Sequence, residues 1–223
     1  MGRYPEADLT KLKRLSAADR PTKVSVSEFA RPLEPAAAAA LLRSLPDQLA
    51  AKTLREVIAR TLAAHRAHRP VVLMLGGHVI KVGVSPCFIE LVERGVLTHV
   101  AIGTDTIHYD PGCDGGSLGE TSLRDFRVLA ATLAGARGAV VPNVGSAVLM
   151  PEVFLKALTV ARNLGASLDG LTTVNFDQIQ HYRPRVNVVE RPTRAEGARG
   201  YSLTGHHEIL LPLFCAGVVA GMA

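Results

Sequence analysis

The chain has 223 residues, of which 48% are hydrophobic and 20% charged, and its formal net charge is +5. That apolar content excludes a globally disordered chain, and the length fits one large domain better than two. Trp is absent and aromatic residues make up only 4%, so surfaces that stack nucleic-acid bases on aromatic side chains are not expected. The positive charge gathers at 11–23 and 183–199, and such runs are more often solvated basic faces than nucleic-acid surfaces.

The first 70 residues predict an arm followed by two helices. Residues 1–34 are polar and mixed in charge and show no period, so we expect an arm that lies over one α/β domain formed by residues 35–223. Pro35 begins the first helix, because proline at the first helical position loses no hydrogen bond. The second helix is expected to open at Thr53, which forms a capping-box pattern with Glu56.

Four short apolar runs predict buried strands, because a strand that is covered on both faces reads as a continuous hydrophobic segment. Helical patterns separate these runs, and strands that alternate with helices imply right-handed crossovers. We therefore expect an α/β protein with an open, mostly parallel sheet and helices on both faces. The four predicted strands are Val71–Leu75, Leu97–Ile102, Ala139–Val141 and Leu171–Phe176.

The helices between these strands carry recognisable start and stop signals. Ser85-Pro86 begins one helix that Gly95 ends, and Ser122 with Asp125 matches a capping box for a helix that reaches Ala134. A glycine-rich loop is expected at 111–119, and Pro151 begins the helix that follows the third strand. An arginine-rich loop is expected after the fourth strand.

The last apolar run, 209–222, predicts a buried terminal helix that begins near 205–207, because spanning a bilayer takes about 20 residues. The amino terminus lacks an apolar core of signal-peptide length. The three cysteines are widely spaced and form no Cys-x-x-Cys pair, so we expect free thiols in a reducing cytoplasm and no membrane association.

A ligand site is expected at the carboxyl ends of the strands, where ligands bind in open parallel sheets. Every predicted strand ends in small or polar residues. Glycines at these ends let a ligand approach the backbone, and the helix N-termini that follow offer backbone N–H donors to an anion. The alternative is that these glycines only form turns. The candidates for cofactor binding are Gly76, Gly77, His78, Thr104, Asn143, Gly145 and Ser146, and those for substrate binding are Asn175, Asp177, Arg183 and Arg185.

Asp105 and His108 are the candidates for acid–base catalysis, because a neighbouring carboxylate can fix the tautomer of a histidine base. In the alternative interpretation, Asp105 caps a turn and His108 is an ordinary loop residue. Neither standard phosphate-binding loop is present, nor is G-x-S-x-G or H-E-x-x-H. The run 206–208 (His-His-Glu) predicts no metal site, since adjacent helical residues do not face each other.

Five segments resemble an uncharacterised bacterial family that is similar, more distantly, to deoxyhypusine synthase. The resemblance covers most of residues 22–221. Gly116–Glu120 looks like the Asp-Gly-Ser-Leu-Gly-Asp turn of the synthase, and Gly145-Ser146 lies where the synthase has a Gly-Gly-Gly turn. The segments are Gly76–Lys81, Ile102–Asp105, Gly116–Glu120, Asn143–Val148 and His181–Arg185.

The resemblance implies a Rossmann-like fold that binds NAD, and a homo-oligomer. In the synthase, NAD accepts a hydride from spermidine and a lysine carries the aminobutyl group. In the synthase that lysine lies in a Ser-Trp-Gly-Lys motif, and this chain lacks the motif because it has no Trp. The position that corresponds to the synthase's active-site histidine falls near Asp125 in this chain. Longer relatives also carry an extra α/β block after the helix that ends here at Gly95.

Three functions remain open at this point. The first is a deoxyhypusine-synthase-like transferase or oxidoreductase that uses NAD or a related nucleotide and acts on a small polar substrate such as an amine. The second is a non-catalytic or degenerate oligomeric module that binds a nucleotide or another protein. The third, transfer of an aminobutyl group to a protein, is the least favoured because the lysine motif is absent.

Overall fold

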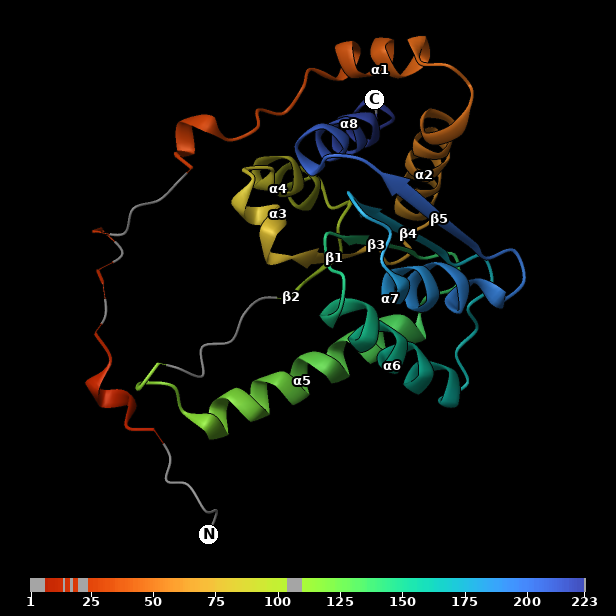
Figure 1. The fold of residues 1–223 in the computed structure, drawn as a ribbon. Coiled ribbons are helices and arrows are strands. Elements are labelled where there is room, and N and C mark those ends of the chain that lie inside the picture. Colours follow the sequence, from red (N-terminus) through yellow and green to blue (C-terminus); the bar gives the residue numbers. More distant parts are fainter. Residues whose placement is uncertain (1–6, 14, 17, 20–23, 104–109, 223) are drawn as a thin grey trace.

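Five parallel strands form the single sheet of the computed structural model, which describes residues 7–13, 15–16, 18–19, 24–103 and 110–222. The strand order is β2-β1-β3-β4-β5 (Figure 1). The predicted α/β class and parallel sheet are confirmed, and each of the four predicted strands takes part. The strands are β1 (Val72–Gly76), β2 (His99–Gly103), β3 (Val140–Val144), β4 (Thr172–Asp177) and β5 (Arg199–Thr204).

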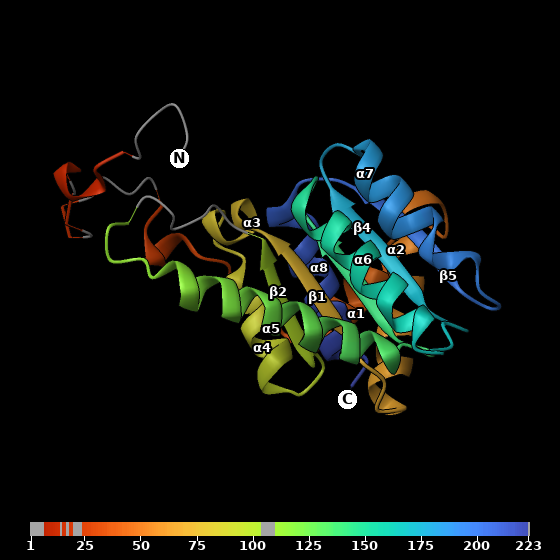
Figure 2. The ribbon, with the colours of Figure 1, turned by 90° about the horizontal axis from the view of Figure 1, so that it is seen from below.

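Helices cover both faces of the sheet, as predicted. One face carries α2, α4 and α8, with α1 outside α8, and the opposite face carries α5, α6 and a π-helical turn (Figures 1 and 2). A short helix, α3, follows β1 directly. The bounds are α1 Pro35–Ser44, α2 Leu49–Arg66, α3 Gly77–Lys81, α4 Ser85–Glu93, α5 Gly115–Ala134, α6 Leu149–Asn163, α7 Tyr182–Pro184, the π-helix Arg185–Glu190 and α8 His207–Ala220.

The sheet separates two hydrophobic cores. Side chains alternate along β1, so Leu73 and Leu75 pack toward α2, α4 and α8, while Val72 and Met74 pack toward α5 and α6. In the first core the rings of Phe176 and Phe214 lie 5.2 Å apart, centroid to centroid. Because both faces of β1 are covered, this strand follows the continuous apolar run that predicted it, whereas β3 and β4 also bury polar residues such as Asn143 and Asn175.

Helix α8 is apolar on nearly all sides because it lies between the sheet and α1. Leu211, Phe214 and Val218 are fully buried or nearly so. The prediction of a buried terminal helix is confirmed. Among the helices that the structure describes, none combines the length and the apolar character that crossing a membrane requires.

Several element boundaries differ from the predicted ones. Helix α2 begins at Leu49, so Thr53 lies inside it, and the predicted capping box is wrong. Helix α5 begins at Gly115, where the Asp114 side chain accepts a hydrogen bond from Ser117 N and caps the helix, so the predicted start at Ser122 is also wrong. The fifth strand, β5, lies where a loop was expected.

The first half of α5 extends beyond the sheet (Figures 1 and 2). Residues 115–125 are exposed except for the half-buried Leu118, whereas Leu129, Ala130 and Leu133 near the other end are buried. The same side of the molecule carries the edge strand β2, whose Val100 and Ile102 are 44% and 48% exposed. Apolar side chains on β2 and Leu123 on the first half of α5 are therefore exposed in the single chain.

Candidate functional site

The strand order reverses between β1 and β3, and the carboxyl ends of these strands are the place where open parallel sheets bind ligands. The structure brings eight of the predicted residues to this edge: Gly76, Gly77 and His78 after β1, Asn143, Gly145 and Ser146 around the end of β3, and Asn175 and Asp177 at the end of β4. Thr104, Asp105 and His108 lie outside the residues that the structure describes.

Gly76 and Gly145 bring the backbones of β1 and β3 into direct contact. A Cβ atom on Gly76 would overlap the carbonyl oxygen of Gly145. Gly145 has a φ of +60°, and a Cβ there would lie 2.7 Å from Val79 Cγ2 and 2.8 Å from His207 Cε1. The protein's own atoms thus fill the space beside both glycines. A ligand at this edge would therefore contact the surrounding side chains and not the backbone of the glycines.

A relay of side-chain amides crosses the sheet from β3 toward β5. Asn143, which is fully buried, donates from Nδ2 to Ser146 O at 2.9 Å and to Asn175 Oδ1 at 2.7 Å. Asn175 Nδ2 then donates to Gln180 Oε1 at 2.7 Å, and Gln180 Nε2 reaches Thr204 Oγ1 at 3.2 Å. Four side chains, from β3, β4, the loop after β4 and β5, are thereby fixed in one network.

The direction of this relay is set by its carbonyl partners. Backbone carbonyls only accept, so the contact with Ser146 O fixes which end of the Asn143 amide is Nδ2. The contact of Gln180 Nε2 with Leu203 O, at 3.4 Å, does the same for Gln180. Asn143 Oδ1 is left as a buried acceptor with no hydrogen-bond partner among the described residues. Leaving such an atom unpaired costs about 1–3 kcal/mol.

His207, the first residue of α8, supplies a second buried acceptor. It is 3% exposed, and its Nε2 lies 3.4 Å from Phe176 O and 4.0 Å from Asp177 Oδ1. The bond to a carbonyl places the proton of the neutral ring on Nε2, so Nδ1 is an acceptor. This Nδ1 has no hydrogen-bond partner within the part of the chain that the structure describes. The ring of His78 lies 6.3 Å away, centroid to centroid.

Other reactive groups at or near this edge have structural roles. Ser146 Oγ accepts from Met150 N at 3.2 Å and so holds the start of α6. Burial raises the pKa of the Cys87 and Cys215 thiols, so neither is an activated nucleophile. Across residues 24–103 and 110–222, no group of three or more His, Cys, Asp or Glu side chains is placed to hold a metal ion.

Arg183 and Arg185, the predicted anion-binding residues, each contact a carboxylate of the same chain. Arg183 Nε lies 3.4 Å from Glu152 Oε1 on α6. Arg185 Nη1 lies 2.7 Å from Glu190 Oε1, and its guanidinium stands 5.8 Å from the ring centroid of Tyr182. An anionic substrate would therefore compete with these carboxylates for either arginine.

Sequence reasoning missed His207 and Gln180. For His207 a signal was available, because 207, 211, 214 and 218 follow helical spacing and place the histidine on the buried face of α8. The same spacing leaves the neighbouring His206 exposed. Gln180 lies in the loop after β4, and no local pattern marks it, because its partners come from β4 and β5.

No protein-family model matches the chain, and no curated protein matches its sequence.

Proposed function

We propose that the chain binds NAD or a related nucleotide at the carboxyl edge of β1, β3 and β4. The observation that carries this proposal is the pair of buried acceptors around the turn after β3, Asn143 Oδ1 and His207 Nδ1. Native proteins pair almost all buried polar atoms, and those left unpaired at a strand switch point are suited to a ligand. The resemblance of Gly76–Lys81 and Asn143–Val148 to the bacterial family favours the same ligand.

The chemistry of the two acceptors selects which part of a nucleotide they would hold. Both need a donor, so they fit a ribose hydroxyl or a carboxamide NH₂ group and do not fit an ionised phosphate oxygen. The turn at Gly76 leaves no space for a pyrophosphate, because Gly145 O fills it. When bound, NAD supplies hydride acceptance.

The substrate class and the setting complete this proposal. A small polar molecule, such as an amine, follows from the resemblance to deoxyhypusine synthase, as does a homo-oligomer. The described thiols Cys87, Cys113 and Cys215 are all free, which suits a reducing compartment such as the cytoplasm. Turnover would make the chain an NAD-dependent transferase or oxidoreductase.

A pair of adjacent histidines gives a sharp test. In a thermal-shift experiment, NAD at about 100 times its dissociation constant should add about 2.7 kcal/mol to the stability of the parent chain. His207→Gln removes the buried Nδ1 acceptor, so this stabilisation should fall. His206→Gln is the matched control, because the His206 side chain is 67% exposed and should leave the stabilisation unchanged.

The comparison includes AMP, ADP-ribose and spermidine, each measured against the parent and both variants. Stabilisation by NAD that is equal in the parent and in His207→Gln would place the nucleotide elsewhere. Absence of stabilisation by all of these ligands would overturn the nucleotide proposal itself. Both results can be interpreted only if the unliganded variants melt cooperatively, which the same scans show.

The second candidate function is that of a non-catalytic oligomeric module. The observation in its favour is the first half of α5, which extends beyond the sheet and is exposed among the residues that the structure describes. A module of this kind would assemble through α5 and would show no turnover. The two functions are separated by activity measurements on the assembled protein.

A further inference from the structure

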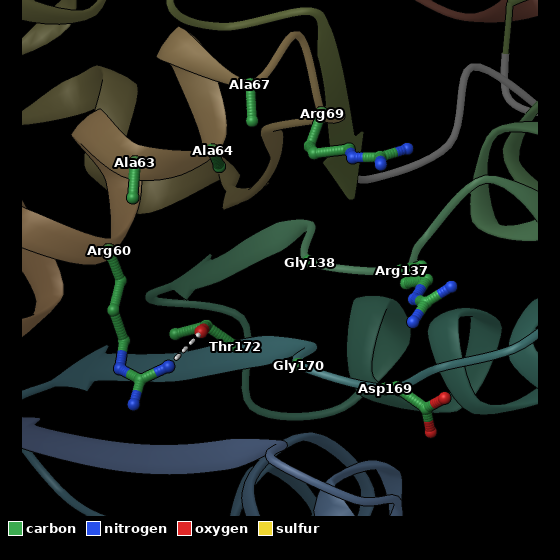
Figure 3. A pocket seen from close by; sticks show the side chains of 10 residues that line it. All are labelled: Arg60, Ala63, Ala64, Ala67, Arg69, Arg137, Gly138, Asp169, Gly170 and Thr172. Atoms are coloured by element: carbon green, nitrogen blue, oxygen red, sulfur yellow. Dashed lines mark hydrogen bonds between the residues drawn. The ribbon is translucent and has the colours of Figure 1, made fainter.

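A cavity of about 480 Å³ opens at the amino-terminal edge of the sheet, at the opposite ends of the strands from the candidate site. It lies between the last turns of α2 and the turns that precede β3 and β4 (Figure 3). Small-molecule sites commonly have volumes of about 300–1,000 Å³. The lining residues are Arg60, Ala63, Ala64, Ala67, Arg69, Arg137, Gly138, Asp169, Gly170 and Thr172.

Three arginines and one aspartate contribute the charge of this cavity, a formal excess of +2. Arg60 is half-buried, and its hydrogen-bond partners among the described residues are neutral: Nε donates to Tyr201 OH at 2.9 Å, and Nη1 to Thr172 Oγ1 at 3.4 Å. Within the described residues, no carboxylate forms an ion pair with Arg60, Arg69 or Arg137. A half-buried guanidinium without a counter-charge is costly unless an anion neutralises it.

The position of Arg60 is fixed before any ligand arrives. Its guanidinium lies 5.8 Å from the centroid of the Tyr201 ring, in addition to the bond with the Tyr201 hydroxyl. Two donors to fixed acceptors and an aromatic neighbour hold the group on the cavity wall, so little side-chain entropy is lost when an anion binds. Figure 3 shows Arg60 at one end of the cavity and Arg69 and Arg137 toward the other.

Small residues keep the cavity open. Ala63, Ala64 and Ala67 line the α2 side, and Gly138 and Gly170 line the sheet side. Both glycines have a positive φ, +69° and +71°, and are held by hydrogen bonds from Gly138 N to Asp169 O (2.9 Å) and from Gly170 N to Glu196 O (2.8 Å). The walls are therefore rigid backbone and methyl groups, and no long apolar side chain fills the space.

We propose that this cavity binds a small phosphorylated molecule. The phosphate lies against the fixed guanidinium of Arg60, whose planar donors match its oxygen atoms, and the hydroxyl groups reach the guanidinium groups at the other end of the cavity. The rest of the molecule packs on the alanine side. Among the described residues, Asp169 is the acid that lines the cavity, and it would accept a hydrogen bond from a hydroxyl group of the ligand. A sugar phosphate has all of these features.

The inference does not rest on the proposed function. The nucleotide site lies at the carboxyl ends of the strands and the cavity at the amino ends, so the two can be tested separately. His207→Gln, which removes an acceptor from the first site, should leave binding in the cavity unchanged.

Isothermal titration of the full chain with ribose 5-phosphate tests the proposal, with ribose as the neutral comparison. We expect saturable binding of ribose 5-phosphate and none of ribose. Arg60→Gln and Arg137→Gln should each weaken binding by about tenfold or more, since each removes a charge-assisted hydrogen bond. Raising the salt concentration should weaken binding as well.

Arg127→Gln is the matched control, because Arg127 is an exposed arginine on α5 and the substitution changes the net charge equally. Equal weakening by Arg127→Gln would show a general charge effect and overturn the site, as would absence of saturable binding to the parent chain. Should Arg60→Gln fail to fold, Arg137→Gln decides the question, because Arg137 is exposed and its side chain makes no hydrogen bond or ion pair within the described residues.

Discussion

At the scale of single residues, what the carboxyl edge can bind depends on which polar atoms lack a hydrogen-bond partner once the strands have packed. The contact between Gly76 and Gly145 consumes the free space that two glycines would offer a ligand. The amide relay uses both N–H groups of Asn143 and leaves its Oδ1. Recognition at this edge therefore depends on buried acceptors, and a donor-rich ligand is the one they select.

Gly145→Ala should destabilise the chain more than Gly95→Ala. Both glycines have a positive φ, +60° and +68°, so each alanine costs about 1–2 kcal/mol of backbone strain. A Cβ on Gly95 meets no atom within 4 Å, whereas one on Gly145 presses on Val79 and His207, which adds about 1–3 kcal/mol. Urea unfolding of the two variants measures the difference; equal losses would contradict the close contact around Gly145.

The rule that parallel strands place their carboxyl ends at one edge correctly brought Asn143 and Asn175 together, although they are 32 positions apart. The rule depends only on strand direction, which apolar runs reveal. It gave no indication that Gly76 and Gly145 would fill each other's space, or that His207 would reach Phe176 O from the start of α8. Those contacts depend on the packing distance between elements, and a sequence pattern does not contain that distance.

At the scale of elements, α8 shows how a helix with little amphipathic character is stabilised. It lies between the sheet on one side and α1 on the other, so apolar residues on most of its surface are buried. Its first residue, His207, reaches the candidate site, and its middle packs into the core. Loss of α8 from the core would therefore remove a buried acceptor from the site as well.

Leu211→Asp should abolish soluble expression, because a carboxylate at a fully buried position has neither water nor a partner. Ile209→Asp, in the same helix but at a position that is 60% exposed, should leave expression and the melting temperature close to those of the parent. Expression of both variants is compared in the soluble fraction. A soluble, cooperatively folded Leu211→Asp variant would show that α8 does not pack as described.

Strands β1, β3 and β4 could be predicted because they are buried on both faces, and β2 because its run Leu97–Ile102 is mostly apolar although one of its faces is exposed. Strand β5 could not, since it lies at the edge of the sheet and carries exposed Arg199 and Ser202 and the half-buried Gly200. Its place is determined by pairing with β4, a contact distant from any local signal. The start of α5 was misplaced for a related reason: glycines suggested a loop, and the Asp114 cap overrode them.

At the scale of the whole molecule, the outward-facing segments predict self-association. Light scattering at micromolar concentration should give at least twice the chain mass of 23.7 kDa. Leu123→Asp, on the projecting half of α5 and at a position that is 58% exposed, should shift the mass toward that of the monomer. Leu164→Asp, 75% exposed just after α6, is the control and should not change it. A monomeric parent would contradict this prediction.

Three glycines with positive φ, Gly138, Gly170 and Gly197, each stand two residues before a strand. The first two are joined to the next turn by hydrogen bonds, from Gly138 N to Asp169 O and from Gly170 N to Glu196 O. A residue added to or deleted from one of these turns would shift its partner in the neighbouring turn as well. Insertions and deletions should therefore be tolerated poorly in these turns, because each one would have to be matched by a change in a turn that is distant in sequence.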